Sequence, residues 1–236
     1  MFLVAWQNAS LGDYNISMRR LSGLYVITEP ALRDPIETAH QVLMAGVRLL
    51  QLRDKTATTR ELVRVGQELR ALTRQHGARL IVNDRLDVAL VIEADGVHLG
   101  QDDLPVPLAR RIAGERLLIG VSAETVAEAM EAESAGADYL GVGPMFATST
   151  KPDAGAPVGP ERLRAIKQAV HIPVFGIGGI TLENAPAVLE AGADGICVVS
   201  AIVGAPDPAA AVRQFLRLIG SGGEQAPHKP SYPKQV

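Results

Sequence analysis

Four short segments of similar composition recur along the chain, and each leads directly into an apolar run. Each contains an alanine and a glycine: Ala45–Arg48, Ala94–Val97, Ala135–Asp138 and Ala191–Asp194. A glycine at or just past a helix end can adopt the left-handed conformation, and the aliphatic residues that follow suit a buried parallel strand. The repeat therefore predicts a helix followed by a strand, several times over, which is a βα pattern.

Eight apolar runs are candidate strands, and helix-like segments separate them. The runs are Leu24–Thr28, Val47–Leu52, Leu80–Val82, Gly96–Leu99, Leu117–Val121, Tyr139–Val142, Val174–Ile177 and Gly195–Val199. Eight strand-and-helix units favour an α/β fold in the form of a single (βα)8 TIM barrel. The count alone leaves an open, doubly wound sheet as the alternative.

The segments between the runs have amphipathic patterns. One of them repeats apolar residues at helical spacing beside charged residues, at Leu62, Val65, Leu69 and Leu72. Val126, Met130 and Glu133 continue the same kind of pattern in another segment. Such spacing predicts helices that pack one face against the barrel.

One domain is the expectation for a chain of 236 residues, of which 47% are hydrophobic, because this is enough to bury one large core. The predicted (βα)8 catalytic domain is residues 21–219, after an N-terminal extension of residues 1–20. Residues 220–236 are predicted to be a flexible C-terminal tail, because they lack apolar residues to pack. The extension has no clear period, and Met18 within it is a candidate for the true initiation site.

Composition disfavours several classes of protein. The formal net charge is −3, with Lys and Arg scattered, so no basic face for nucleic acid is expected. Cys197 is the sole cysteine, so we predict no internal disulfide, no cysteine-rich zinc site and a cytoplasmic location. No apolar run is long enough to span a bilayer, and Met1–Trp6 does not resemble a secretory signal, so no membrane association is expected. The sequence allows a homo-oligomer but contains no pattern that specifies one.

Short polar clusters directly follow five of the apolar runs. They are Gln51–Lys55, Asn83–Asp84, Gln101–Asp103, Thr148–Lys151 and Gly176–Gly179. In a parallel barrel the carboxyl ends of all strands meet at one rim. A ring of Lys, Arg, Asp and Gly there could hold Mg²⁺ and several phosphates, which indicates an enzyme.

In the first cluster, Gln51, Arg53 and Lys55 alternate with two other residues. In extended backbone all three side chains would project to the same side, where they could meet one anion. The alternative is a rim salt bridge from Arg53 or Lys55 to a neighbouring carboxylate.

The second and third clusters supply carboxylates. Asp84 and Asp103 follow neighbouring strands, close enough to share a hard cation such as Mg²⁺, whereas capping of the next helix is the alternative for Asp84. We expect His98 to be a buried, hydrogen-bonded histidine, since no second ligand stands at metal spacing. Ser122 is either a phosphate donor or the cap of a helix that begins near Thr125.

The later clusters predict a phosphate site. Thr148, Thr150 and Lys151 lie in a long polar loop that could cradle an anion, with a solvated turn as the alternative. Gly179 with Ser200 on the next loop fits the place where barrels often bind phosphate; a simple tight turn is the alternative. Together the clusters imply two anion sites, a metal-assisted one on the early strands and a metal-free one on the last strands.

These motifs, in this order and spacing, resemble those of the thiamine phosphate synthases (thiamin-phosphate pyrophosphorylases). The resemblance extends from about Leu21 to about Leu218 and rests on Tyr25–Thr28, Gln51–Lys55, Asn83–Asp84, His98–Asp103, Gly120–Ser122, Gly141–Pro144, Thr148–Lys151 and Gly176–Thr181. It implies a barrel transferase that joins hydroxymethylpyrimidine diphosphate to a thiazole phosphate, with Mg²⁺, and releases pyrophosphate. The implied partners are these two small molecules.

The resemblance also assigns roles to residues. Those implied to bind the pyrimidine diphosphate are Gln51, Arg53, Lys55, Asn83 and Lys151. The implied Mg²⁺ ligands are Asp84 and Asp103, and Ser122 is implied to contact the pyrophosphate and pyrimidine region. Those implied to hold the thiazole phosphate are Thr148, Thr150, Gly179, Val199 and Ser200. The residues expected to act in catalysis are Arg53, Lys55, Lys151 and Ser122.

The implied mechanism is dissociative, because a pyrimidine methylene cation forms before the thiazole nitrogen captures it. Fixed charges and a metal that stabilise the leaving pyrophosphate would then suffice, which explains why the polar ring contains no nucleophile or triad. Two alternatives are a thiazole tautomerase-like barrel and a non-catalytic sensor of a phosphate ligand. Neither requires the combination of Arg53, Lys55, Asp84, Asp103 and Lys151.

Overall fold

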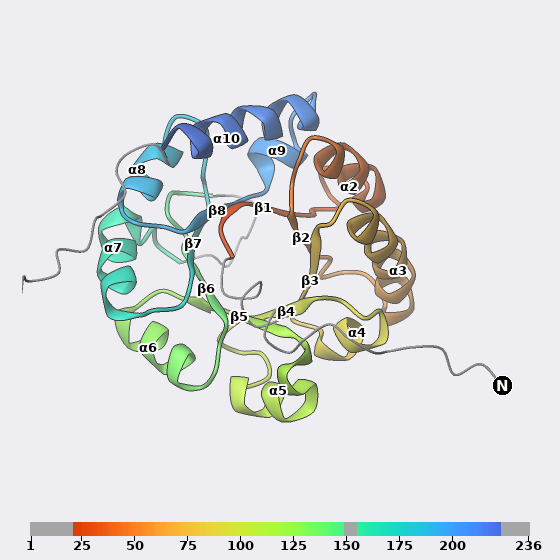
Figure 1. The fold of residues 1–236 in the computed structure, drawn as a ribbon, viewed down its shortest axis with the longest axis horizontal. Helices are drawn as coiled ribbons and strands as arrows, with labels where there is room; N and C mark the ends of the chain where they lie inside the picture. Colours follow the sequence, from red (N-terminus) through yellow and green to blue (C-terminus); the bar gives the residue numbers. More distant parts are fainter. Residues whose placement is uncertain (1–20, 149–154, 223–236) are drawn as a thin grey trace, which may run out of the picture.

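A computed structural model of the chain describes residues 21–148 and 155–222. Within these ranges eight parallel strands form a closed barrel in sequence order, with the helices outside it (Figure 1). The strands are β1 (Gly23–Ile27), β2 (Leu49–Leu52), β3 (Arg79–Asn83), β4 (Gly96–Leu99), β5 (Leu118–Ala123), β6 (Tyr139–Val142), β7 (Val174–Ile177) and β8 (Gly195–Val198). The predicted (βα)8 barrel is confirmed, and the doubly wound alternative is excluded.

The helices surround the barrel as an outer layer. They are α2 (Pro35–Met44), α3 (Thr59–Gln75), α4 (Leu86–Val91), α5 (Val106–Ala113), the 3₁₀ helix η1 (Gly114–Arg116), α6 (Val126–Ser134), α7 (Gly159–Ala169), α8 (Ala185–Glu190), α9 (Ser200–Val203) and α10 (Pro208–Gly222). Helix α10 packs on α2, α8, α9 and β1, and so closes the outer ring between its last and first members (Figure 1). No helix in the described ranges is long and apolar enough to cross a membrane.

The predicted domain boundaries stay predictions. Helix α10 continues to Gly222, past the boundary expected after residue 219. The expected extension, with the candidate start Met18, and most of the expected tail lie outside the described residues.

The predicted helix stops are confirmed in three of the four repeats. Gly46, Gly136 and Gly192 have φ angles of 111°, 95° and 98°, in the left-handed region that glycine adopts without steric cost. The prediction for the second repeat is wrong: Glu93 takes the left-handed turn, with φ 53°, and Gly96 begins β4. A Cβ at Gly96 would lie 2.6 Å from the carbonyl oxygen of Leu118, so this glycine serves close strand packing.

The predicted apolar faces are confirmed for α3 but not for α6. Helix α3 buries Leu62 and Leu69, as expected. In α6 Met130 is 52% exposed, and the buried residues are Ala129 and Ala132. The prediction gave more weight to the larger side chain, whereas the two small alanines allow the helix to pack closely.

Two buried apolar clusters form the core. The larger one fills the space between the barrel and the helices. The second consists of Leu21, Tyr25, Ile27, Leu49, Ile81, Leu118, Tyr139, Phe175 and Cys197, which lie at alternate strand positions and therefore face the barrel interior. Continuing this alternation towards the carboxyl ends of the strands places Gln51, Asn83, His98 and Ser122 inside the upper rim.

At the opposite ends of the strands, three aspartates make equivalent interactions. Each aspartate lies just before a strand. Its Oδ2 atom accepts a backbone N–H from the neighbouring strand that comes earlier in the sequence. The same Oδ2 atom pairs with a cation on the helix that leads into that earlier strand. The three groups are Asp95 with Leu80 and Arg70, Asp138 with Ile119 and Arg110, and Asp194 with Val174 and Lys167. Before β2, in the first of the four repeated segments, Arg48 stands where the other three segments have this aspartate. The lower rim is therefore held together by repeated, partly buried ion pairs.

Candidate active site

The first polar cluster divides where β2 ends. Gln51 lies inside the barrel, 2% exposed, and its Nε2 donates to the Tyr25 hydroxyl at 2.6 Å. Strand β2 ends at Leu52, so the extended backbone expected through residue 55 stops there. Thr28 stabilises the backbone after β2, because its Oγ1 accepts the N–H of Arg53 at 3.0 Å.

The two cations of this cluster pair with carboxylates at the rim. Arg53 Nη1 lies 2.6 Å from Glu29 Oε2, and both side chains are largely buried. Lys55 Nζ lies 3.6 Å from Asp84 Oδ2. The rim salt bridge that the sequence left as an alternative is therefore present. It also places Lys55 beside the second cluster, so that one cation faces the carboxylates predicted to bind metal.

Asp84 and Asp103 lie side by side, as predicted for a shared cation. Burial, followed by the hydrogen bond and charge of Asp103, raises the pKa of Asp84 to about 6, and Lys55 opposes this rise. Asp84 does not cap helix α4, whose N-cap is Arg85 without a side-chain cap bond, so the capping alternative is wrong. Asp84 also has a φ of 61°, a strained value for a residue with a side chain.

The carboxyls of Asp84 and Asp103 could bind Mg²⁺ together with a phosphate ligand. The described residues contain no group of three or more His, Cys, Asp or Glu that could hold a metal. Mg²⁺, however, is usually bound through one or two carboxylates together with substrate phosphates and water. Two carboxyls held in contact, beside Lys55, suit a metal that arrives with a phosphate ligand.

His98 and Ser122 form part of a hydrogen-bonded group inside the rim. His98 Nδ1 lies 3.2 Å from the Tyr139 hydroxyl, and His98 Nε2 lies 3.1 Å from Ser122 Oγ. The prediction of a hydrogen-bonded histidine is confirmed, although the side chain is only partly buried. Ser122 does not cap α6, because Thr125 accepts the N–H of Glu128 at 3.2 Å. The Ser122 hydroxyl therefore belongs to the rim.

The loops after β6 and β7 pack on each other. Met145 N–H donates to the carbonyl of Ile177 at 2.8 Å, and Phe146 N–H to that of Gly178 at 3.0 Å. Gly179 has a φ of 65°, and a Cβ there would lie 2.5 Å from the Ala147 carbonyl oxygen. The glycine is thus needed for the turn and for loop packing, and its part in a phosphate site stays a prediction.

The remaining predicted residues of the later strands are placed as follows. Val199 precedes the four-residue helix α9, and Ser200 is its first residue. Thr148 is partly buried at the edge of the described range. Thr150 and Lys151 lie outside the described residues. The structure therefore brings Gly179, Val199 and Ser200 to one side of the rim.

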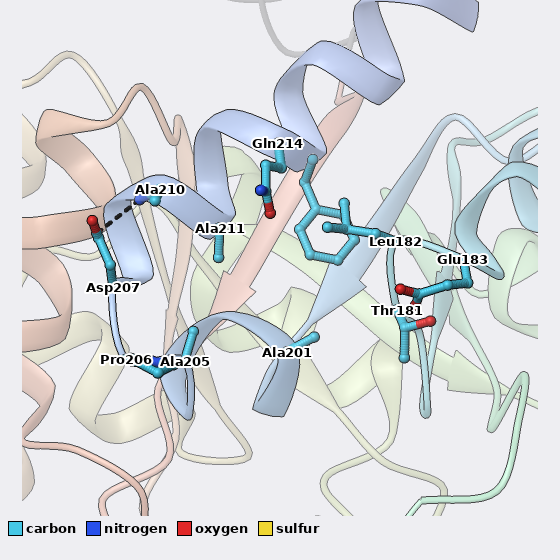
Figure 2. Close-up of a pocket in the computed structure, with 11 residues that line it drawn as sticks. Thr181, Leu182, Glu183, Ala201, Ala205, Pro206, Asp207, Ala210, Ala211 and Gln214 are labelled. Carbon is cyan, nitrogen blue, oxygen red and sulfur yellow. Dashed lines mark hydrogen bonds between the residues drawn. The ribbon is translucent and has the colours of Figure 1, made fainter.

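A pocket of about 340 Å³ lies between the loop after β7, helix α9 and the start of α10 (Figure 2). Its wall includes Thr181, Glu183, Ala201 and Gln214, and Asp207 accepts the N–H of Ala210 at its edge. None of the predicted site residues lines this pocket.

Sequence reasoning missed three residues that contact predicted site residues. Tyr25 and Tyr139 read as ordinary core positions of strands, and Glu29 carried no motif. The available signal was the pair of glycines inside strands, Gly120 and Gly141. A Cβ at Gly120 would lie 2.1 Å from Tyr139 Cζ, and one at Gly141 would lie 3.0 Å from His98 Cε1. Glycines at inward positions thus mark the space that large polar rings occupy.

Comparisons with known proteins identify the family of the chain. Residues 24–202 match the family model described as thiamine monophosphate synthase. The chain is 54% identical to a thiamine-phosphate synthase of Methanospirillum hungatei over 200 residues, covering 84% of this chain and 97% of that protein. It is 54% identical to one of Chloroflexus aurantiacus, covering 86% and 95%. The solved thiamine phosphate pyrophosphorylase of Pyrococcus furiosus superimposes with a TM-score of 0.82 at 42% identity, covering 87% of this chain and 99% of that one.

Proposed function

The chain belongs to the thiamine monophosphate synthase family, and we propose that it makes thiamine phosphate from a hydroxymethylpyrimidine diphosphate and a thiazole phosphate. It is an enzyme of the transferase class, like the relatives named as thiamine-phosphate synthases. No observation favours the tautomerase or the sensor. The cytoplasmic location stays a prediction of the sequence.

The observation that carries the proposal is the contact between Asp84 and Asp103 beside Lys55. Two carboxyls in contact, one with a pKa raised to about 6, are poised to exchange a shared proton for a divalent cation. In this proposal Mg²⁺ supplies Lewis-acid neutralisation of the diphosphate oxygens. Asp84 and Asp103 hold it, and Lys55 offers a neighbouring positive charge.

Arg53 and Asn83 support the diphosphate on the adjacent strand ends. The Arg53 guanidinium is held against Glu29, so its direction is fixed before a substrate arrives. Asn83 faces the interior beside His98 in the strand register. Lys151, on the loop outside the described residues, is proposed to complete the binding of the diphosphate. Pre-placed charges of this kind need no reorganisation during the reaction.

The thiazole phosphate is proposed to bind across the rim, at the loops after β7 and β8. Gly179 offers a backbone that a side chain would obstruct, and Ser200 is an exposed hydroxyl at the first residue of α9. Val199 comes between β8 and α9 and is proposed to contribute at the same position, together with Thr148 and with Thr150, which lies outside the described residues. Backbone N–H groups and hydroxyls of this kind bind phosphate without a metal.

The proposed reaction has two steps. The bond between the pyrimidine methylene carbon and the diphosphate oxygen breaks, and its electron pair leaves with the pyrophosphate. The thiazole nitrogen then donates its lone pair to the pyrimidine methylene cation, which gives thiamine phosphate. Arg53, Lys55 and Lys151 stabilise the charge that develops on the leaving group, and Ser122 donates a hydrogen bond. No side chain acts as a nucleophile.

The test is an assay of the purified full chain with both substrates, with Mg²⁺ or with a chelator, followed by chromatography of thiamine phosphate. The proposal predicts product with Mg²⁺ and a loss of at least a hundredfold in rate with the chelator. A rate that does not depend on a divalent cation would remove the metal from the proposal. No product from a protein that binds thiazole phosphate would overturn the synthase function.

A further inference from the structure

Four consecutive hydrogen bonds cross the inside of the barrel and connect five of its strands. Gln51 Nε2 donates to Tyr25 at 2.6 Å, and the hydroxyls of Tyr25 and Tyr139 lie 3.1 Å apart. Tyr139 contacts His98 Nδ1 at 3.2 Å, and His98 Nε2 contacts Ser122 Oγ at 3.1 Å. The two ends, Gln51 and Ser122, are both proposed substrate contacts. The three residues between them have no role in the proposed function.

The packing around this chain of hydrogen bonds holds its rings in place. Tyr25, Tyr139 and Phe175 pack edge to face, with ring centroids 5.7–6.1 Å apart, an arrangement favoured for buried aromatic rings. The Tyr139 ring fills the space beside Gly120, and the His98 ring fills the space beside Gly141. Tyr25 and Tyr139 are 1% and 0% exposed, so neither ring can leave its position without opening the barrel interior.

Both tyrosines keep their protons. Burial raises the pKa of Tyr25 and of Tyr139 well above the ordinary value for a phenol. Each hydroxyl therefore has a single hydrogen to donate and can accept on its oxygen. A buried hydroxyl group that makes two contacts donates in one and accepts in the other, because unsatisfied donors are costly in the interior.

The direction of donation follows from Gln51. An amide nitrogen can only donate, so Tyr25 accepts from Gln51 and donates its hydrogen to Tyr139. Tyr139 then donates to His98 Nδ1, which must be the unprotonated nitrogen of the neutral ring. The ring proton is on Nε2 and is donated to Ser122 Oγ. Ser122 accepts this bond, and its own hydrogen remains for a ligand.

We propose that Tyr25, Tyr139 and His98 are positioning residues that make Ser122 a hydrogen-bond donor, and Gln51 Oε1 an acceptor, towards the pyrimidine diphosphate. The inference rests on the proposed function for the identity of the ligand. Ser122 then presents a hydrogen to a ring nitrogen or phosphate oxygen, and Gln51 presents an oxygen to an N–H group. Because the four hydrogen bonds are consecutive, the two tyrosine hydroxyls orient both Gln51 and Ser122.

The direct test is ¹⁵N NMR of the imidazole rings, which distinguishes the Nε2–H from the Nδ1–H tautomer. The full chain has five histidines, and His98 is assigned by the signal that His98→Gln removes. The proposal predicts that neutral His98 is the Nε2–H tautomer in the unmodified protein. An Nδ1–H signal would reverse the bonds that His98 makes with Tyr139 and Ser122 and overturn the proposal.

Two single-hydroxyl variants make a matched pair. Tyr139→Phe removes the donor to Nδ1, so we expect a mixed tautomer signal for His98. Tyr25→Phe removes the donor to Tyr139 but keeps the Tyr139 hydroxyl beside Nδ1, so the loss of the Nε2–H signal should be smaller than in Tyr139→Phe. A melting temperature within a few degrees of the unmodified protein shows that each variant is folded. Equal effects of the two variants on the tautomer would contradict the proposal.

Kinetics provides the second measurement. Tyr139→Phe should lower kcat about tenfold, the order expected for one misdirected hydrogen bond, with the KM for thiazole phosphate unchanged. An unchanged kcat would overturn the positioning role. The tautomer signal does not depend on turnover, so an inactive unmodified protein with the Nε2–H pattern would reject the proposed function while the hydrogen-bond direction holds.

Discussion

At Asp84 the fold imposes a cost that a bound cation would relieve. The carboxyl is partly buried against Asp103, and its pKa rises from 3.8 to about 6. The folded state therefore binds more protons than the unfolded state between about pH 4 and pH 6. By linkage the free energy of unfolding falls as the pH rises through this window. Above pH 6 the charge on Asp84 is destabilising, and a positive partner such as Lys55 offsets it.

This predicts a pH dependence that Asp84→Asn removes. With a chelator present, the unmodified protein should lose stability from pH 4 to pH 7 relative to the variant, since an amide carries no charge. Denaturant unfolding at several pH values measures the difference. Parallel stability curves for the two proteins would show that Asp84 does not titrate in this window.

Single residues at the rim also show where sequence reasoning stops. Asp84 and Asp103 were predicted as a pair because each ends a neighbouring strand, and the barrel brings strand ends together. The partner of Arg53 was not predicted, because Glu29 lies on another strand end and no local pattern links the two. Tyr139 was read as core, because the place of its ring depends on Gly120 of the neighbouring strand β5.

At the scale of elements, the loops after β6 and β7 form one unit around Gly179. A side chain there would have both a strained φ and a close contact with the Ala147 carbonyl oxygen. We predict that Gly179→Ala displaces the loop and raises the KM for thiazole phosphate at least tenfold. Gly77→Ala is the control, because Gly77 has a similar φ of 61° but no atom within 4 Å of the added Cβ.

The two glycine variants separate strain from site geometry. Gly77→Ala should lower stability by about 1 kcal/mol, the usual cost of a left-handed residue with a side chain, and leave the kinetics unchanged. Steady-state kinetics and denaturant unfolding of both variants provide the comparison. If Gly179→Ala has a normal KM, the loop does not shape the phosphate site.

The ion pairs of the lower rim connect neighbouring βα units. Arg110 donates to Asp138 and to the carbonyl groups of Gly114, Leu117 and Gly136, so one side chain ties α5 to the starts of β5 and β6. We predict that Arg110→Met costs about 2–3 kcal/mol of stability, because partly buried acceptors lose a charged donor.

The matched control for Arg110 is Arg64→Met. Arg64 pairs with Glu68 on an exposed face of α3, and exposed pairs contribute at most about 1 kcal/mol. Denaturant unfolding compares the two variants, and kcat should be near normal in both because neither residue lies at the upper rim. Equal losses of stability would show that the lower-rim pairs are not structural ties.

For the molecule as a whole, the strand-and-helix order was readable because buried parallel strands form continuous apolar runs. All eight predicted strands are present, three with the predicted bounds and the others with ends that differ by at most two residues. The amphipathic pattern failed at Met130, where two small alanines decide which face packs. Patterns along the chain thus predict elements and rim positions, whereas hydrogen bonds between strands depend on the closed barrel.

The barrel brings two kinds of polar group to one rim: carboxylates and cations on the early strands, and glycine and hydroxyl groups on the last ones, which are the two proposed anion sites. The division suits one substrate that must lose pyrophosphate and a second that keeps its phosphate. The central claim is that Asp84 and Asp103 hold the Mg²⁺ that serves the first substrate.

The most direct measurement is a Mg²⁺ titration of thiamine phosphate formation by the unmodified protein and by Asp103→Asn. The account predicts that Asp103→Asn needs at least tenfold more Mg²⁺ for half-maximal rate, with the KM for thiazole phosphate unchanged, because one anionic ligand is lost. The same half-maximal Mg²⁺ concentration in both proteins would contradict the account and place the metal elsewhere.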